Sequence, residues 1–260
     1  SLKNFSGFEF DLNDPKVSHL NLKRDSILLL KQGTWEHKHP FNGFILSRNP
    51  LSIFSSLWTF DVETDDQNPK ELWVNNTNRM IRWLNDIDPA LCNGFCDLTP
   101  EIQFSVFYNR RMGKLLQTGL PVIYYENLVC SPEKSFQELC DLLTLEFEPD
   151  ILNAHTKYSS KLEGHGKNDL SRAIDNKSLE KYKTILSPEQ IEIIATATKT
   201  VSSQYGYIEG ALVHPVENKK RNKAMSNESE YRSDLDGLSA KALKYKAHLR
   251  KSIQRVKRKI

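Results

Sequence analysis

The sequence predicts an α/β protein, with a mainly parallel β-sheet flanked by helices and a helical tail at the C-terminus. Short continuous apolar runs occur at 26–30, 43–46 and 121–125, and such runs are typical of strands buried on both faces of a parallel sheet. Segments with a helical spacing of apolar residues separate and follow these runs. Strands and helices that alternate in this way favour a parallel α/β architecture.

Two helices are predicted between the second and third strands, over 70–86 and 101–118, because apolar residues recur there at helical spacing. Core packing is the expected role of Trp73 and Trp83. Together with Phe95, these tryptophans are also candidates for stacking on an acceptor molecule. The residues that share the apolar faces are Trp73, Met80 and Leu84 in the first helix and Phe104, Phe107 and Leu115 in the second.

Two later helices have clear start signals. Ser131 and Pro132 suit the N-cap and first helical positions of one helix, which we expect to pack against the sheet. The other begins at Ser187, whose side chain is placed to form a capping box with Gln190, and it ends at Gly206.

The chain divides into three parts. Residues 1–212 form the predicted domain, 213–236 a charged linker, and 237–260 a basic amphipathic helix. Two interpretations of this helix stay open. It packs on its own domain or pairs with a second copy in a homo-oligomer, or it contacts an anionic membrane surface or an acidic partner.

Charge and cysteine content argue against two kinds of site. The net charge is +3, but residues 237–260 hold nine Lys and Arg and no acid, so the rest of the chain is net acidic. A nucleic-acid-binding body would be basic, and none is predicted. Cys92 and Cys96 lie four residues apart, but no second pair of ligands has zinc-finger spacing, so we expect thiols and no metal site.

The stretch 44–58 is the most informative about function. An apolar strand ends at Arg48, Asn49 and Pro50 change the direction of the chain, and a helix that contains Ser56 follows. Arg48 and Ser56 are therefore expected at the carboxyl edge of the sheet, where open α/β folds bind ligands. An arginine fork with a nearby hydroxyl suits a phosphate group. The alternative is that Arg48 pairs with a carboxylate and Ser56 is an ordinary helical residue.

Three segments, in the same order along the chain, resemble the sulfotransferase superfamily. Arg48-Asn49-Pro50 with Ser56 resembles its 3′-phosphate-binding motif. The segment 122–133 resembles its strand followed by Tyr-Glu-Asp-Leu and a Pro-containing helix start, and 174–207 resembles its closing helix. The resemblance implies a P-loop NTPase-like sulfotransferase fold. It also implies transfer of a sulfuryl group from the co-substrate 3′-phosphoadenosine-5′-phosphosulfate (PAPS) to an acceptor hydroxyl or amine.

The resemblance assigns nucleotide contacts to particular residues. Arg48 and Ser56 would bind the 3′-phosphate of PAPS, and Tyr125 would contact the adenine. The loop 164–167 lies where relatives close a basic loop over the nucleotide, so Lys167 and Arg172 are candidate contacts. The alternative for this glycine-containing loop is a flexible surface turn.

The catalytic centre departs from the family pattern. Lys31 matches the lysine that opens the Lys-Thr-His segment of cytosolic relatives, but the histidine that serves as their base is missing. The nearest candidate bases are Glu36, His37 and His39. Of these, His37 has a suitable ordinary pKa of about 6.5, and an exposed loop histidine is the alternative. The family's 5′-phosphosulfate loop has no match either. We therefore expect that loop to precede Ser1, in an N-terminally truncated member of the superfamily.

Other functions and the compartment are less constrained. A kinase of the related P-loop fold would need a Gly-x-x-x-x-Gly-Lys-Ser/Thr loop and a Mg²⁺-binding acid, and the sequence shows neither. The remaining alternative is a noncatalytic nucleotide-binding module of the same fold. The acceptor is expected to be a small molecule or a glycan. The sequence does not determine the cellular compartment. The cytoplasm is slightly favoured, and the Golgi lumen would be expected if an upstream membrane anchor had been lost.

Overall fold

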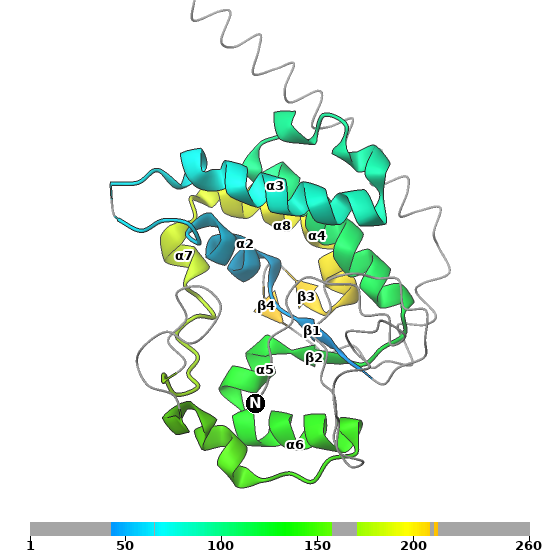
Figure 1. Ribbon diagram of the computed structural model, residues 1–260, viewed down its shortest axis with the longest axis vertical. Helices are drawn as coiled ribbons and strands as arrows, with labels where there is room; N and C mark the ends of the chain where they lie inside the picture. Colours follow the sequence, from blue (N-terminus) through cyan, green and yellow to red (C-terminus); the bar gives the residue numbers. More distant parts are fainter. Residues whose placement is uncertain (1–42, 65, 158–170, 209–210, 213–260) are drawn as a thin grey trace, which may run out of the picture.

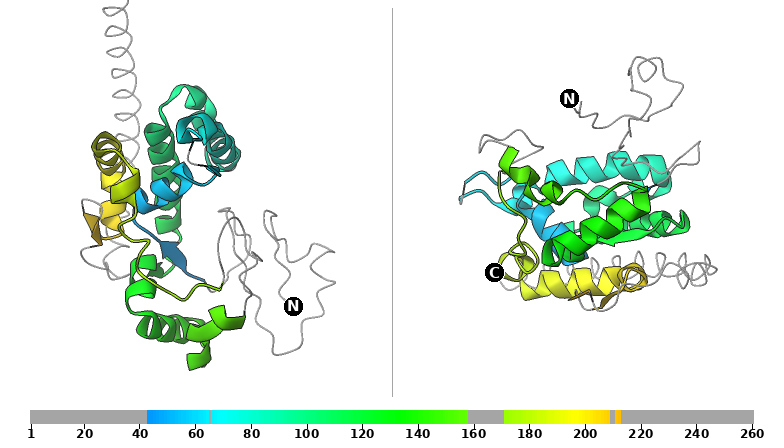
Figure 2. Two further views of the ribbon diagram at one scale, coloured as in Figure 1. Left: turned by 90° about the vertical axis from the view of Figure 1, so that its left-hand side faces the viewer. Right: turned by 90° about the horizontal axis from the view of Figure 1, so that it is seen from below.

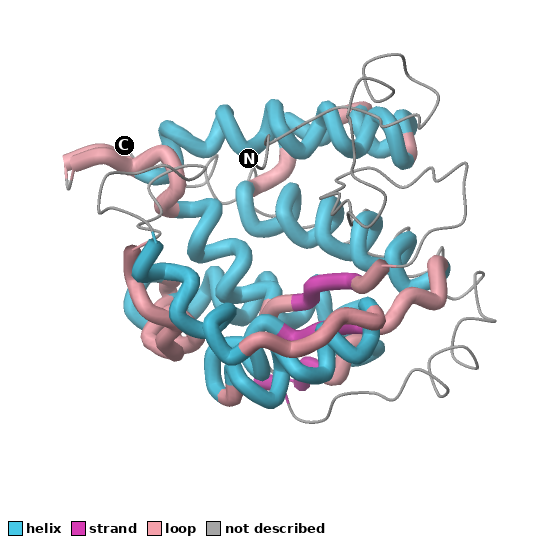
Figure 3. Tube along the Cα trace, turned by 60° about the horizontal axis from the view of Figure 1, so that its bottom comes forward, coloured by secondary structure: helices cyan, strands magenta, loops and turns pink. Residues whose placement is uncertain are grey.

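Helices dominate the computed structural model, which describes residues 43–64, 66–157, 171–208 and 211–212. Strands β1 (Ile45–Ser47) and β2 (Val122–Tyr124) pair in parallel, with Ser47 opposite Tyr124. The antiparallel pair β3 (Tyr207–Ile208) and β4 (Ala211–Leu212) follows the last described helix. Figure 3 shows how little of the described chain is strand. The described fold is therefore broadly α/β, with a small parallel sheet.

Seven α-helices and three short 3₁₀ helices are found in the described part. Proline is the first residue of the longer helices because its fixed φ suits the first turn, where its missing N–H is not needed. The α-helices are α2 (Pro50–Trp58), α3 (Pro69–Ile87), α4 (Pro100–Gln117), α5 (Tyr125–Cys130), α6 (Pro132–Leu143), α7 (Tyr182–Ile185) and α8 (Pro188–Gln204). The 3₁₀ helices are η1 (Pro89–Cys92), η2 (Phe95–Asp97) and η3 (Pro149–Lys157).

The predicted helix boundaries are confirmed to within a residue or two. α3 covers the predicted 70–86 and α4 the predicted 101–118. At α8, the Ser187 hydroxyl accepts a hydrogen bond from the Gln190 N–H, and both halves of the capping box are present. The N-cap position predicted for α6 is confirmed, although the Ser131 side chain makes no capping hydrogen bond.

The helices pack in two groups around the parallel sheet. Figures 1 and 2 show α3, α4 and α8 on one side of β1 and β2, and α5 and α6 on the other. α4 packs against both α3 and α8, while α2 contacts α3, α7 and α8. The helix beginning at 132 was expected to pack against the sheet, but the main contacts of α6 are with α5 and η3.

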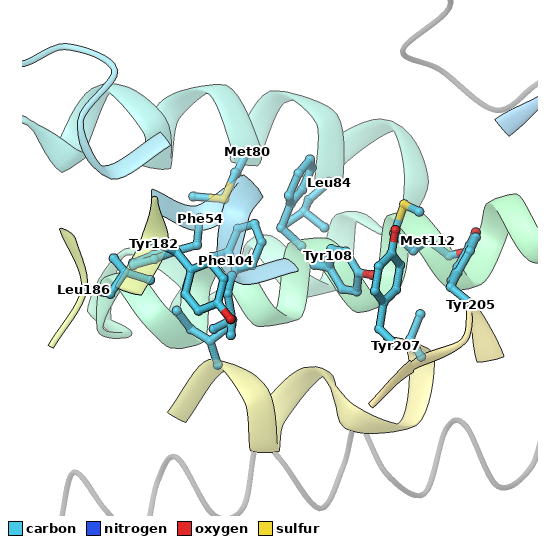
Figure 4. Packing of buried hydrophobic residues seen from close by; sticks show 14 of the residues in the cluster. Phe54, Met80, Leu84, Phe104, Tyr108, Met112, Tyr182, Leu186, Tyr205 and Tyr207 are labelled. Carbon is cyan, nitrogen blue, oxygen red and sulfur yellow. The ribbon is translucent and has the colours of Figure 1, made fainter. Parts of the chain in front are cut away.

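A buried aromatic cluster fills the space between α2, α3, α4 and α8 (Figure 4). Phe54 is fully buried, with ring centroids of Trp73 and Phe104 5.2 and 5.3 Å away. Trp73 and Phe95 are also buried, which confirms core packing for Trp73 and leaves neither ring open to solvent. Core packing was the wrong prediction for Trp83, which is 37% exposed.

Several predicted features lie outside the described residues. These are the strand at 26–30, the linker 213–236 and the basic helix 237–260. Among the helices that the structure does describe, none combines the length and the apolar character needed to cross a membrane.

Candidate anion-binding site

The parallel register brings two of the predicted nucleotide-binding residues together. Arg48 directly follows β1, and Tyr125 directly follows β2 as the first residue of α5. Because Ser47 and Tyr124 are register partners, the residues that directly follow the two strands lie at the same edge of the sheet. The Arg48 guanidinium carbon lies 4.4 Å from the centroid of the Tyr125 ring, a cation–π contact.

The hydrogen-bond donors of Arg48 outnumber their acceptors. Its Nη2 donates to the carbonyl oxygen of Ser178 over 3.4 Å, a long hydrogen bond. Its Nε is buried and has no hydrogen-bond partner within the described ranges. None of the ion pairs found among the described residues includes Arg48, so the carboxylate partner of the alternative interpretation is not seen there. A buried cationic donor without an acceptor is costly, which favours an anion at this position.

Ser178 contacts both side chains of the pair. Its hydroxyl lies 2.9 Å from the Tyr125 hydroxyl, in addition to the carbonyl contact with Arg48. The next residue, Leu179, accepts a hydrogen bond of 3.1 Å from the Ser52 hydroxyl of α2. One short segment thus lies against Arg48, Tyr125 and α2. The sequence analysis missed Ser178, and no local pattern marks it, since it lies 130 residues from Arg48.

The N-terminus of α2 lies at the same edge, where the Glu126 carboxylate accepts a hydrogen bond from the N–H of the N-cap residue Asn49. The Asn49 side chain accepts a hydrogen bond of 2.8 Å from the Leu51 N–H, and no acidic residue lies in the first turn. The partial positive charge of a helix N-terminus favours a bound anion. Ser56 is exposed one turn after Ser52, so it lies on the face of α2 that contacts Leu179.

Glu126 connects the site to the C-terminal end of the described domain. Its Oε1 accepts a hydrogen bond from the Asn49 N–H, and its Oε2 accepts one from the Tyr207 hydroxyl, both of 2.9 Å. Burial, and secondly the negative charge of Glu126, raise the pKa of both Tyr207 and Tyr108. Both phenols therefore remain protonated at neutral pH, and Tyr207 remains a donor to the carboxylate.

The remaining predicted residues are not joined to this site by the described structure. Arg172 is exposed and forms an ion pair with Asp175, with 2.6 Å between Nη2 and Oδ2. Hydrogen bonds from Arg172 are the main reason that the pKa of Asp175 lies below its usual value. Lys31, His37 and Lys167 lie outside the described residues, so their roles stay predictions.

No protein-family model matches the chain, and no curated protein matches it significantly. The geometry around Arg48 is therefore the structural basis for a functional hypothesis. It combines a guanidinium whose Nε has no acceptor among the described residues, two hydroxyls, an aromatic ring and a helix N-terminus. Such a combination suits a phosphate group attached to an aromatic base.

Proposed function

We propose that the chain is a PAPS-dependent sulfotransferase domain that binds the 3′-phosphate of the nucleotide at Arg48. The observation that supports this most strongly is the placement of Arg48 at the carboxyl end of β1, against Tyr125 and with a buried Nε that lacks an acceptor among the described residues. The order of sequence motifs supports the same proposal. The proposal includes a P-loop NTPase-like sulfotransferase fold for this domain.

In this proposal each side chain of the site has a separate role. Arg48 donates charge-assisted hydrogen bonds to the 3′-phosphate, and the exposed Ser56 hydroxyl donates another. Tyr125, whose ring already lies against the Arg48 guanidinium, contacts the adenine. Ser178 lies beside the hydroxyl of Tyr125 and is a further polar contact for the nucleotide.

The reaction itself is an in-line transfer at sulfur. An acceptor oxygen or nitrogen attacks the sulfur atom, and the bond between sulfur and the bridging phosphate oxygen breaks. The electron pair leaves with 3′-phosphoadenosine-5′-phosphate (PAP). The acceptor's proton passes to a base, for which His37 is the candidate, and Lys31 is the candidate cation for the developing charge. The acceptor is a small molecule or a glycan.

The first prediction concerns Arg48 and nucleotide selectivity. Isothermal titration of the full chain with PAP and with AMP measures the contribution of the 3′-phosphate as the ratio of the two affinities. We expect Arg48→Ala to lower PAP affinity by about 10- to 100-fold, because hydrogen bonds to charged groups are removed. AMP affinity should change little.

Arg82→Ala is the matched control, because Arg82 is an exposed arginine of α3 away from the sheet edge. It should leave both affinities unchanged. An Arg48→Ala protein that binds PAP as tightly as the unaltered chain would disprove the donor-site assignment. Nucleotide binding without transfer of labelled sulfate from PAPS would favour the noncatalytic nucleotide-binding module instead.

A further inference from the structure

The Glu126 carboxylate lies close to both proposed nucleotide-binding positions. Glu126 directly follows Tyr125, and it accepts a hydrogen bond from the backbone N–H of Asn49, which directly follows Arg48. Its other oxygen accepts a hydrogen bond from the Tyr207 hydroxyl. The carboxylate therefore joins the end of β1, the end of β2 and the beginning of β3.

We infer that Glu126 is a positioning residue, which holds the turn after β1 so that the Arg48 guanidinium faces the 3′-phosphate. This inference rests on the proposed function. At this turn Pro50 has no N–H, and the Asn49 side chain accepts a hydrogen bond from the Leu51 N–H. The Asn49 N–H is thus the backbone group through which Glu126 fixes the direction of the chain between Arg48 and α2.

The hydrogen bonds of Glu126 also direct its carboxylate away from an ion pair with Arg48. Each carboxylate oxygen accepts a hydrogen bond from a neutral donor, the amide of Asn49 or the phenol of Tyr207. No ion pair between Glu126 and Arg48 occurs among the ion pairs of the described residues. Tyr207, which is 1% exposed, holds the carboxylate on the interior side of the turn. The guanidinium consequently keeps its donors for the nucleotide.

A double-mutant cycle between Glu126 and Arg48 tests this inference. The measured quantity is the preference of the full chain for PAP over AMP, obtained by titration calorimetry for the unaltered protein, Glu126→Ala, Arg48→Ala and the double variant. We expect Glu126→Ala to reduce the preference by about tenfold. In the Arg48→Ala background, Glu126→Ala should not reduce the PAP preference further, because the effect of Glu126 acts through Arg48.

Two further variants separate positioning from simple loss of stability. Glu126→Gln keeps an acceptor for the Asn49 N–H and donates an amide N–H to the Tyr207 oxygen, so it should retain most of the preference. Tyr207→Phe should reduce it. Tyr205→Phe is its matched control, since Tyr205 is also fully buried and donates a hydrogen bond of 2.9 Å, but to the Met112 carbonyl. It should lower the melting temperature without changing the preference.

The results distinguish the inference from the proposal on which it rests. If Arg48→Ala removes the PAP preference but Glu126→Ala, folded by circular dichroism, retains it, Glu126 has no positioning role. Equal losses of PAP and AMP affinity in Glu126→Ala would also overturn the inference. If Arg48→Ala leaves the preference unchanged, the proposed nucleotide site itself is wrong. Glu192→Ala, at an exposed position on α8, should behave as the unaltered protein.

Discussion

Tyr108 shows how a buried phenol beside a carboxylate responds to pH. The side chain is 3% exposed, and its hydroxyl has no hydrogen-bond partner among the residues that the structure describes. Burial raises its pKa above the ordinary value of 10.0, and the charge of Glu126 raises it further. The folded protein therefore keeps this proton at a pH where the unfolded chain has lost it.

The second prediction follows from this difference in proton binding. Because the unfolded state loses the proton first, the free energy of unfolding should fall as the pH rises above about 10. Tyr108→Phe cannot lose this proton, so between about pH 8 and pH 11 it should lose about 1 kcal/mol less stability than the unaltered chain. Urea unfolding of both proteins at both pH values measures the difference. Equal losses of stability would contradict a raised pKa for Tyr108.

Residues far apart in sequence explain why parts of the site were not predicted. Arg48 was found because it ends an apolar run, and Tyr125 was found through the resemblance of the segment 122–133. The parallel register makes the two residues neighbours. The contacts of Ser178 with Arg48 and of Tyr207 with Glu126 join residues that lie 130 and 81 positions apart. Spacing within one sequence has no signal for such pairs, because only the packing of α7 and α8 brings them together.

At the scale of single elements, the N-cap serines of α6 and α8 allow a direct comparison of helix capping. Ser187 and Ser131 both precede a proline that begins a helix, and both are exposed. Only Ser187 forms side-chain hydrogen bonds with its helix, as acceptor from the Gln190 N–H over 3.2 Å. A comparison of the two positions therefore separates two contributions to the free energy of unfolding: that of the capping hydrogen bond and that of a serine at the N-cap.

The third prediction uses this pair. Ser187→Ala should lower the free energy of unfolding by about 1 kcal/mol, the usual effect of removing an N-cap side chain. Ser131→Ala is the control and should cost clearly less, because no capping hydrogen bond is lost. Urea denaturation of both variants measures the difference, and a larger effect at Ser131 would show that the cap of α6 forms in solution.

Local signals account for the success of the helix predictions. Proline, a capping serine and apolar periodicity all lie within one or two turns, so α3, α4 and α8 are readable from neighbouring residues. Trp83 was misjudged because periodicity identifies a face of a helix but not what covers it. In the structure the Arg111 guanidinium carbon lies 4.0 Å from the centroid of the Trp83 ring, and the tryptophan is 37% exposed.

At the scale of the molecule, one aromatic cluster joins the elements that hold the site. Phe54 belongs to the same helix as Ser56, yet its ring lies against Trp58, Trp73 and Phe104. The orientation of α2, and with it the direction of its N-terminus, therefore depends on core packing.

The fourth prediction is that Phe54→Ala lowers the free energy of unfolding by about 3–5 kcal/mol, through lost burial and the cavity it leaves. Phe60→Ala is the matched control, because Phe60 is 45% exposed, and its effect should be much smaller. Thermal and urea unfolding measure both. Similar effects of the two substitutions would mean that α2 is not held by the aromatic cluster.

The long sequence separations within the site have a consequence for synthesis. Arg48 and Asn49 leave the ribosome well before Glu126, and Tyr207 follows 81 positions after Glu126. Contacts between residues so far apart in sequence form late in folding, because the chain between the two residues must first close into a loop. A nascent chain that ends before Tyr207 would lack the donor to Glu126. If the proposed nucleotide site is correct, such a chain should prefer PAP over AMP less strongly than the full chain does.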